Sequence, residues 1–468
     1  MIAAVLAFVI PSAAGISIAR WADPRGRLAP ETIALWVGVG VPLGVALAGV
    51  VAWAWLVLGG SLGLPSAIAE SVLLLGAAAA AWRTRGAAPE EPAPPRPTAL
   101  DRIALAAALA GFGVATAAFV REVPHVPYGD WDAWAIWNLH ARFLALGASE
   151  WRLLFSPELT FSHNEYPLLL PAIVARTWAW SSGASGPIAV AALSALSPLL
   201  AVYGAVARRA GAVPAAVASL LLAGTGEWLV WALSQDSDIP IAALVVAALA
   251  CLTFSEEKAA TGALRGTGVA ALLLGAAAIA KDEGLVFLGV AGLWAIFRHG
   301  REGALRRAAA VGAGCAIPLL LRLHFHAALA PTFAADYTGG QSLSALATRL
   351  VDVPRWAYIV KTASGHLPGV SRWLPVVAIG VVLLGARPRD LLRSASLVPV
   401  LAAYAAYVAA WGLSGLGVNE ERLAWHISTS APRVLLQPWP ALLLALLALV
   451  PPASPAAAAT PAEPRARR

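Results

Sequence analysis

The sequence predicts an all-α membrane protein, a polytopic bundle that crosses the bilayer about 13 times. Of its 468 residues, 59% are hydrophobic and only 13% are charged, and the mean hydropathy is +0.72. Soluble domains are about a quarter charged. Apolar stretches of roughly 17–25 residues recur along the chain, and each is long enough to span a hydrocarbon layer of about 30 Å. In lipid such stretches must be helices, because every backbone polar group needs a partner inside its own segment.

The predicted crossings follow one another with mostly short loops between them. The pair 268–280 and 284–297 is short for a full double crossing. In chain order the crossings fall at about 2–19, 31–58, 66–82, 103–120, 187–207, 211–233, 239–254, 268–280, 284–297, 308–329, 373–386, 394–414 and 434–450.

Four regions are expected along the chain. Residues 1–82 form an N-terminal extension of three membrane helices, of which the first is a retained helix because no basic segment precedes it. Residues 83–102 are a cytoplasmic linker, rich in Pro and Arg, that cannot form a packed core. Residues 103–450 form the membrane core, with a large outer loop at 121–184, and residues 451–468 form a disordered cytoplasmic tail.

The side of each loop follows from the Lys and Arg clusters, which favour the cytoplasm. With these clusters inside, the loops at 121–184, 330–372 and 415–433 lie outside. Only one crossing then fits between the first outer loop and Arg208 and Arg209. We assign it to 187–207 and interpret 166–182, with Arg176 and two tryptophans, as a helix lying in the membrane interface. The alternative is that 166–182 spans and the charge rule fails once.

Charge and cysteine usage exclude other classes of protein. The net charge is +7 and the pI is about 9.8. These basic residues are scattered among loops and form no continuous face, so no nucleic-acid partner is predicted. Cys251 and Cys315 lie in apolar runs without metal-ligand spacing, and we interpret both as buried hydrophobic residues.

The first outer loop carries two candidate catalytic carboxylates in the stretch GDWDAW. Asp130 and Asp132 would point the same way, about 7 Å apart, in an extended segment. In a helix they would diverge by about 200°. Partial desolvation at an apolar surface suits a carboxylate to act as a general base. The alternative is that one of them caps the helix that follows, and the spacing does not choose between the two.

Other polar residues are expected at the same membrane level. Ionisable groups at that depth are costly, which favours a shared functional cavity. Asp238 could instead begin a helix and Lys281 could be a snorkelling anchor. His324 and His326 are too few for a metal site unless a distant carboxylate joins them, so no metal or other cofactor is required. The candidate substrate-binding residues are His163, Asn164, Glu165, Asp238, Lys281, Glu283, His426 and Arg433.

Over residues 103–450 the chain resembles the GT-C family of membrane glycosyltransferases, which includes the protein O-mannosyltransferases and the aminoarabinose transferases of lipid A. The resemblance rests on the order of five elements rather than on any single motif. These are an acidic motif in the first outer loop, a polar segment before a juxtamembrane helix, an Asp-x-Pro, a Lys-bearing turn and an Arg-bearing element near the C-terminus: GDWDAW, HNEYPLLLP, DSDIP, AKDEGL and WHISTSAPRVLLQPWP.

The resemblance implies transfer of a sugar from a polyprenyl-phosphate donor to a hydroxyl of an envelope glycan, lipid or protein. By that likeness Asp130 or Asp132 is the base, the reaction inverts the anomeric carbon, and Lys281 and Arg433 hold the lipid phosphate. The active site would face outward from a bacterial inner membrane. The family more often has adjacent acidic residues, so Asp-Trp-Asp leaves the identity of the base and any metal dependence open.

A transporter or lipid flippase is the main alternative function. Charged residues within apolar segments would suit it, but transporters often show repeated halves with broken helices at the bilayer midplane. Here the polar groups gather at one surface and no internal repeat is visible. The sequence therefore favours the glycosyltransferase.

Overall fold

The computed structural model describes residues 2–23, 28–85, 97–180, 183–254, 260–331, 342–386, 394, 396–415 and 419–451. Within these ranges the chain forms helices, turns and loops and no strands, which confirms the predicted all-α class. Nearly all of the predicted tail and the middle of the predicted linker lie outside the described residues, as do parts of the second and third outer loops.

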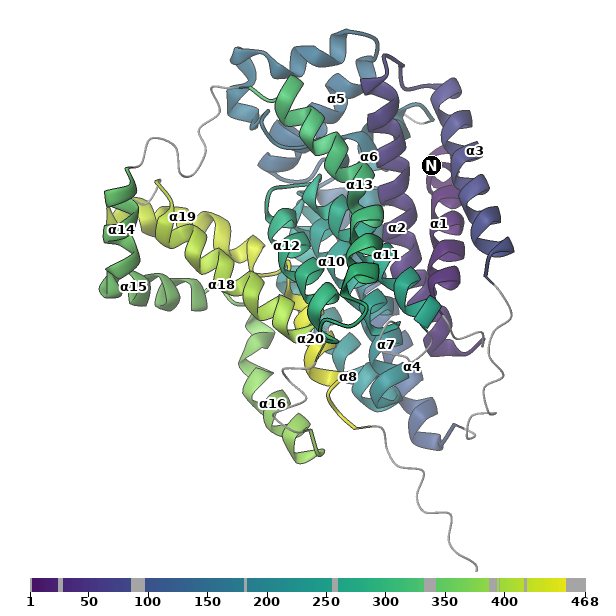
Figure 1. The fold of residues 1–468 in the computed structure, drawn as a ribbon, viewed down its shortest axis with the longest axis vertical. Helices are drawn as coiled ribbons and strands as arrows, with labels where there is room; N and C mark the ends of the chain where they lie inside the picture. Colours follow the sequence, from purple (N-terminus) through teal and green to yellow (C-terminus); the bar gives the residue numbers. More distant parts are fainter. Residues whose placement is uncertain are drawn as a thin grey trace, which may run out of the picture.

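The helices pack into one main body, and a smaller arm projects from its side (Figure 1). The arm contains α14, α15 and parts of α18 and α19. In chain order the helices are α1 (Ile2–Ala22), α2 (Pro30–Val57), α3 (Leu64–Arg83), α4 (Ala99–Glu122), η1 (Val123–His125), η2 (Ala133–Trp137), α5 (Asn138–Leu146), η3 (Glu150–Phe155), η4 (Pro157–Ser162), α6 (Leu169–Trp178), α7 (Ser185–Ala210), α8 (Ala212–Ala223), α9 (Gly226–Leu233), α10 (Asp238–Phe254), α11 (Ala260–Ala278), α12 (Glu283–Phe297), α13 (Ala304–Ala328), α14 (Leu343–Val351), α15 (Val353–Ser364), η5 (Gly369–Trp373), α16 (Leu374–Leu383), α18 (Leu397–Leu413), α19 (Glu420–Val434) and α20 (Trp439–Leu447).

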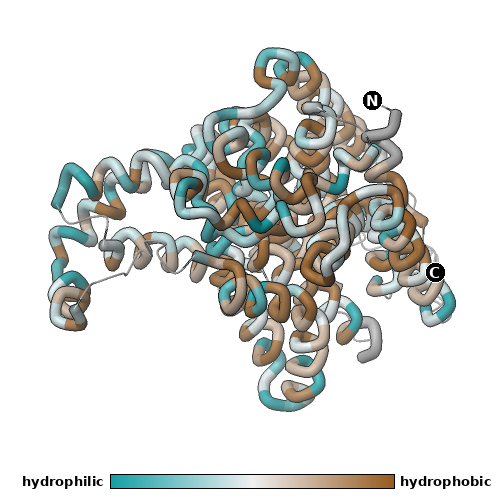
Figure 2. The backbone as a smooth tube through the Cα atoms, turned by 90° about the horizontal axis from the view of Figure 1, so that it is seen from above, coloured by the Kyte–Doolittle hydropathy of each residue, from teal (hydrophilic) through white to brown (hydrophobic). Residues whose placement is uncertain are grey.

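Five helices in the described part of the chain are long and apolar enough to cross a membrane: α2, α3, α4 continued by η1, α7 and α13. Two bent pairs, α8 with α9 and α19 with α20, raise that number to seven if each pair is one span. Hydrophobic residues run through the whole main body (Figure 2). These features are those of a helical membrane protein. The larger number of 13 crossings stays a prediction, because the described part of the chain contains no further helix that meets the same criteria of length and hydropathy.

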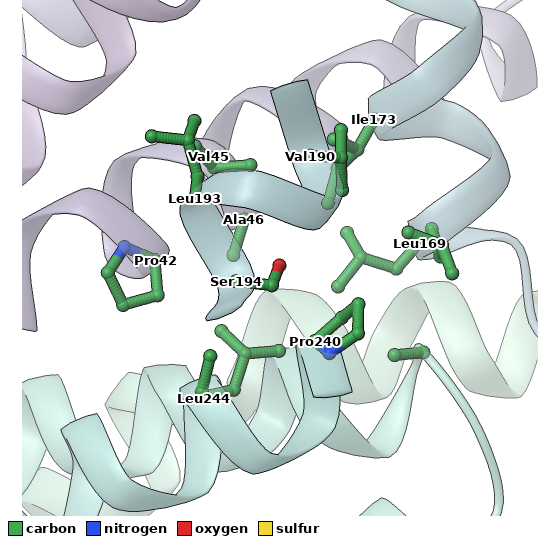
Figure 3. A pocket seen from close by; sticks show the side chains of 13 residues that line it. Pro42, Val45, Ala46, Leu169, Ile173, Val190, Leu193, Ser194, Pro240 and Leu244 are labelled. Atoms are coloured by element: carbon green, nitrogen blue, oxygen red, sulfur yellow. The ribbon is translucent and has the colours of Figure 1, made fainter. Parts of the chain in front are cut away.

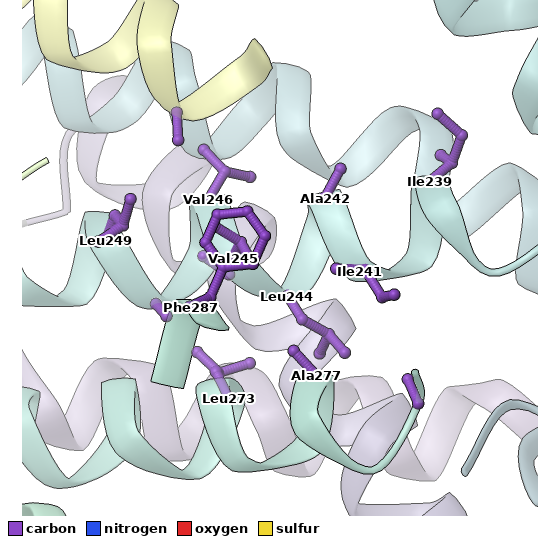
Figure 4. Close-up of a cluster of buried hydrophobic side chains, with 14 of the residues drawn as sticks. Ile239, Ile241, Ala242, Leu244, Val245, Val246, Leu249, Leu273, Ala277 and Phe287 are labelled. Carbon is purple, nitrogen blue, oxygen red and sulfur yellow. The ribbon is translucent and has the colours of Figure 1, made fainter. Parts of the chain in front are cut away.

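The centre of the bundle is built from α2, α7 and α10. Residues Ile239 to Leu252 of α10 are almost all buried, on every face of the helix, as expected for a helix that is apolar all round. Figure 4 shows side chains of α10 meeting Leu273 and Ala277 of α11 and Phe287 of α12. These contacts place the two ends of α10, and with them Asp238, at fixed positions in the body.

Small residues bring α1 and α2 into backbone contact. A Cβ atom added at Gly15 would lie 1.9 Å from the carbonyl oxygen of Gly40, and one added at Gly44 would lie 1.8 Å from that of Pro11. Such close approach is typical of helix pairs in membranes, where tight packing replaces the hydrophobic effect as the driving force. The α1–α2 pair is therefore part of the packed bundle.

The first three helices are also joined to the later helices by buried ion pairs. Glu70 of α3 pairs with Arg176 of α6, and Arg176 donates a further hydrogen bond of 2.6 Å to the carbonyl of Ala7. Arg208 of α7 also pairs with Asp23, which directly follows α1, at 2.7 Å. Residues 1–82, predicted as an extension, thus pack within the same body as the helices of 103–450.

The interpretation of 166–182 as an interfacial helix needs correction. α6 has only ten residues, so it does not cross the membrane by itself. However, its residues from Leu169 to Thr177 are buried inside the protein, and Arg176 is 4% exposed. Arg176 was expected at the lipid–water boundary, but its charge is satisfied by Glu70 in the interior. The sequence could not show this, because Glu70 lies 106 positions away.

Candidate functional site

The two aspartates of the first loop occupy different positions at the start of one helical run, residues 131–146. Asp130 precedes the run, and its carboxylate accepts a hydrogen bond of 2.7 Å from the backbone N–H of Trp131. Its carbonyl oxygen accepts from the N–H of Ala133 at 3.0 Å. Asp132 lies inside the first turn, immediately before the π-helical turn η2. The two side chains therefore diverge, and Asp130 has the position of a helix cap.

The first loop is fixed to the turn between α9 and α10. The N–H of Asp130 donates to the carbonyl of Ser234 at 3.1 Å, and the Gln235 amide donates to the carbonyl of Pro127 at 3.1 Å. Gly129 and Gln235 both have positive φ, of 73° and 57°. A Cβ at Gly129 would lie 2.4 Å from the Ser234 oxygen, so only glycine fits this contact. The contact holds Asp132 opposite Asp236.

Arg433 of α19 joins these two carboxyl groups. Its guanidinium forms an ion pair with Asp132 and lies 3.9 Å from Asp236. Asp132 is half-buried, whereas Asp236 is 3% exposed. Burial, together with the neighbouring Asp238, raises the pKa of Asp236 well above its usual range. Asp236 is therefore the carboxyl group of this cluster that favours the neutral form.

A second charged cluster surrounds Lys281, beyond the end of α11. Its ammonium lies 3.5 Å from Asp238 and 3.0 Å from Glu283. Asp238 also accepts a hydrogen bond from Gln437, whose own amide oxygen accepts from the Tyr407 hydroxyl. Sequence reasoning did not identify Gln437 or Tyr407. A single amide in the turn before α20 and a single phenol in the apolar helix α18 carry no local signal of such a link.

The cluster around Lys281 opens into a cavity of about 780 Å³, counted to its open mouth. The cavity combines charged groups with aromatic walls, and its lining includes Lys281, Glu283, Tyr166, Tyr407, Trp411 and His426. The structure thus brings His426 to the same cavity as Lys281, as the sequence predicted.

The three polar residues before α6, His163, Asn164 and Glu165, have two different roles. His163 Nδ1 donates a hydrogen bond of 2.9 Å to the Glu165 carboxylate, and its ring stacks on Tyr166, which lines the cavity. Asn164 is buried, and its amide donates to the carbonyls of Leu154 and Ser156, both at 3.1 Å. His163 and Glu165 therefore lie near the cavity, while Asn164 holds the turns η3 and η4 together.

A separate cavity lies among α2, α6, α7 and α10 (Figure 3). Its lining is apolar except for Ser194. It contains no titratable side chain that could carry acid–base chemistry. The two charged clusters and the larger cavity are therefore the better candidate for a reaction site.

Among the described residues, no group of three or more His, Cys, Asp or Glu side chains is arranged to hold a metal ion. His324 and His326 lie on α13. Near them, Arg322 pairs with Asp282. The Asp282 carboxylate is thus engaged by a guanidinium.

Comparisons with known proteins found no matching family, curated protein or solved structure. The function must therefore be inferred from the side chains of this chain and their placement. Two features carry that inference: the Asp132–Arg433–Asp236 cluster and the cavity beside Lys281.

Proposed function

We propose that the protein is a membrane glycosyltransferase similar to the GT-C enzymes, and that it moves a sugar from a polyprenyl-phosphate donor to a hydroxyl of an envelope glycan, lipid or protein. The observation that carries the proposal is a half-buried carboxylate, Asp132, paired with Arg433, whose charge acts on Asp238 together with that of Lys281, a residue of the cavity wall. A base and two cations at one site are the groups that such a reaction needs.

In the proposed reaction Asp132 is the general base. It removes the proton of the acceptor hydroxyl, whose oxygen attacks the anomeric carbon from the face opposite the phosphate. The bond between that carbon and the phosphate oxygen breaks, and the phosphate leaves with both electrons. Inversion follows from this single displacement. Asp130 is not assigned the role, because its carboxylate accepts from the adjacent backbone N–H of Trp131, whereas Asp132 is the carboxylate paired with Arg433.

The leaving phosphate would be held by Arg433 and Lys281. In the structure both cations are paired with carboxylates: Arg433 with Asp132, and Lys281 with Asp238 and Glu283. A phosphate arriving at Arg433 competes with Asp132 for the same guanidinium N–H groups. Donor binding then releases the carboxylate that must accept the proton. The base becomes available only when the donor is in place.

The proposal includes a location and a topology. The chain would cross a bacterial inner membrane about 13 times, with the site facing the periplasm. Polyprenyl-phosphate sugars and envelope acceptors would meet there. The positions of the charged clusters at the end of the bundle near the first loop support this orientation, because that loop lacks the Lys and Arg clusters typical of the cytoplasmic side.

The experiment compares Asp132→Asn with Asp130→Asn in purified full-length protein supplied with polyprenyl-phosphate sugars and an envelope extract as acceptor. We expect Asp132→Asn to lower transfer by roughly 10²–10⁴-fold, the usual contribution of a general base. Asp130→Asn should stay near wild type, because an amide oxygen can accept the same hydrogen bond. Thermal unfolding of both variants checks that they fold.

Two outcomes would overturn the proposal. One is undiminished transfer in Asp132→Asn. The other is a wild-type protein that transfers no sugar from any polyprenyl-phosphate donor. This outcome includes a protein that only moves the intact lipid-linked sugar across vesicle membranes, as a flippase would.

A further inference from the structure

We propose that a groove lined in part by the helical run 131–146 is a carbohydrate-binding site that holds a pyranose ring of the acceptor. The proposal deepens the proposed function and rests on it for the use of the site. The groove has a volume of about 520 Å³, and its lining includes Tyr128, Trp134, Asn138, Arg142 and Trp178. None of these residues belongs to the charged clusters described above.

One face of the helical run 131–146 supplies three of these residues. Trp134, Asn138 and Arg142 are spaced by four positions, so they lie along the same side of a helix. The π-helical turn η2 falls in the same stretch, and such turns recur at functional sites. Asp132 lies two residues before Trp134 in the same run and pairs with Arg433. A single helix thus presents the proposed base and the groove.

The chemistry of the lining suits a sugar. Pyranose rings have apolar C–H faces and a rim of hydroxyls, so they stack on aromatic rings and hydrogen-bond at their edges. Trp134 and Tyr128 are each 55% exposed and offer ring surface. The guanidinium carbon of Arg142 lies over Trp178, 4.4 Å from its ring centre. The guanidinium also carries N–H donors from which hydroxyl oxygens can accept.

The walls of the groove are held in place before any ligand arrives. The indole N–H of Trp178 donates to the carbonyl of Gly183 at 2.9 Å. Trp134 makes an edge-on contact with Trp131, with 5.9 Å between ring centres. Preorganised aromatic walls reduce the entropy lost on binding. The groove is therefore a formed site rather than a loose patch of exposed rings.

Asn138 connects the groove to the charged cluster. Its amide donates to the Gln235 side chain at 3.4 Å. A narrow cavity lined by Asn138, Gln235 and Asp236 lies directly behind it. A sugar in the groove would be one side chain away from Asp236. This closeness to the charged cluster suits a site for the part of the acceptor next to its reacting hydroxyl.

The two other readings of exposed aromatics fit less well. Tryptophans that only anchor a protein in the membrane interface project outward, whereas these rings enclose a hollow with an amide and a guanidinium. An anionic lipid headgroup usually meets several basic residues, whereas Arg142 is the one cation among the described residues of this lining. A neutral ligand with many hydroxyls matches the lining best.

The binding experiment uses the full-length protein in detergent and saturation-transfer NMR with methyl glycosides of mannose, glucose, galactose, arabinose and N-acetylglucosamine. Trp134→Ala and Arg142→Ala remove a ring face and a donor. Trp373→Ala removes an indole that is 61% exposed but lies outside the groove. We expect at least one glycoside to bind wild type and Trp373→Ala equally, and to bind both groove variants at least tenfold more weakly.

The same variants are then assayed for transfer. The groove predicts a raised KM for the acceptor, with kcat nearly unchanged at saturating acceptor. The proposal is overturned if no glycoside binds, or if Trp134→Ala and Arg142→Ala bind as tightly as wild type. Glycoside binding without any sugar transfer would leave the groove standing and overturn the proposed function. Transfer with an unaltered acceptor KM in the groove variants would overturn the use of the groove for the acceptor and leave the proposed function standing.

Discussion

Arg433 is shared by two carboxyl groups with different surroundings. Asp132 is half-buried at the edge of the site, whereas Asp236 is enclosed in the protein. Breaking a buried charge pair by removing one partner costs about 3–5 kcal/mol. Any change at Arg433 therefore alters both the proposed base and the packing behind it. Asp132 is the more informative residue to change, since its removal leaves Arg433 with Asp236.

Gly129 is the residue on which the position of Asp132 depends most directly. Replacing it with alanine would force a Cβ into the Ser234 carbonyl at a positive φ. We expect Gly129→Ala to lose about 1–3 kcal/mol of folding free energy and to lose transfer activity, because the first loop detaches from the α9–α10 turn. Thermal unfolding and transfer are measured together. Gly76→Ala on α3, where a Cβ meets nothing within 4 Å, is the control and should be neutral. Equal melting temperatures for the two variants would contradict the account.

At the scale of single residues, the sequence singled out most residues of the two charged clusters. It missed the hydrogen bonds that connect them to the rest of the protein. The structure brings Asp132, Arg433, Asp238, Lys281 and Glu283 into two adjacent clusters. It also gives Asp130 and Asp132 different contacts, a difference that their spacing in the sequence could not show. The link through Gln437 and Tyr407 was missed, and Asn164 was misplaced, because a buried amide and an exposed one look the same in a sequence.

At the scale of elements, the first loop is a small folded unit rather than an open loop. Its anchor is His140 of α5, which is fully buried and hydrogen-bonds the carbonyl of Ser162 at 2.9 Å. Burial lowers the pKa of His140 from 6.5 to about 3. The neutral ring is therefore the form that the folded loop requires.

Acid should loosen this unit. Because the folded pKa of His140 lies below the unfolded value, its contribution to stability is complete above about pH 6.5 and is lost as the pH falls toward 3. The loss has a limit of about 1.4 kcal/mol per pH unit. We expect the melting temperature to fall between pH 7 and pH 4.5 in wild type and to fall less in His140→Gln. His163→Gln, at an exposed histidine of the same loop, should behave like wild type. A parallel decline in all three proteins would contradict the prediction.

The sequence predicted the helical elements well where they are long and lipid-facing, as in α4 and α13. It predicted less where a helix is short and enclosed. α6 shows the reason: a buried arginine and an interfacial arginine have the same local sequence, and only a distant partner distinguishes them.

For the whole molecule, the main consequence of the fold is that the N-terminal helices are structural members of the core. α2 lies in the centre, and α3 supplies the counter-charge of α6. Arg176→Met alone should destabilise the protein by about 3–5 kcal/mol, because Glu70 is left charged and buried. The double variant Glu70→Met with Arg176→Met should return close to wild type in thermal unfolding. Leu285→Met, at a partly exposed position of α12, controls for an added methionine. A double variant no more stable than the single one would contradict the ion-pair account.

The pairing of Glu70 with Arg176 also constrains how the protein is made. A ribosome delivers α3 to the membrane about a hundred residues before α6 emerges. During that interval Glu70 lacks Arg176, its partner in the folded protein, so an intermediate must either shelter the carboxyl group or keep it protonated. Insertion of α6 then supplies this arginine and completes the ion pair. Biogenesis of this protein is therefore expected to depend on a membrane chaperone or insertase that holds the early helices until their partner arrives.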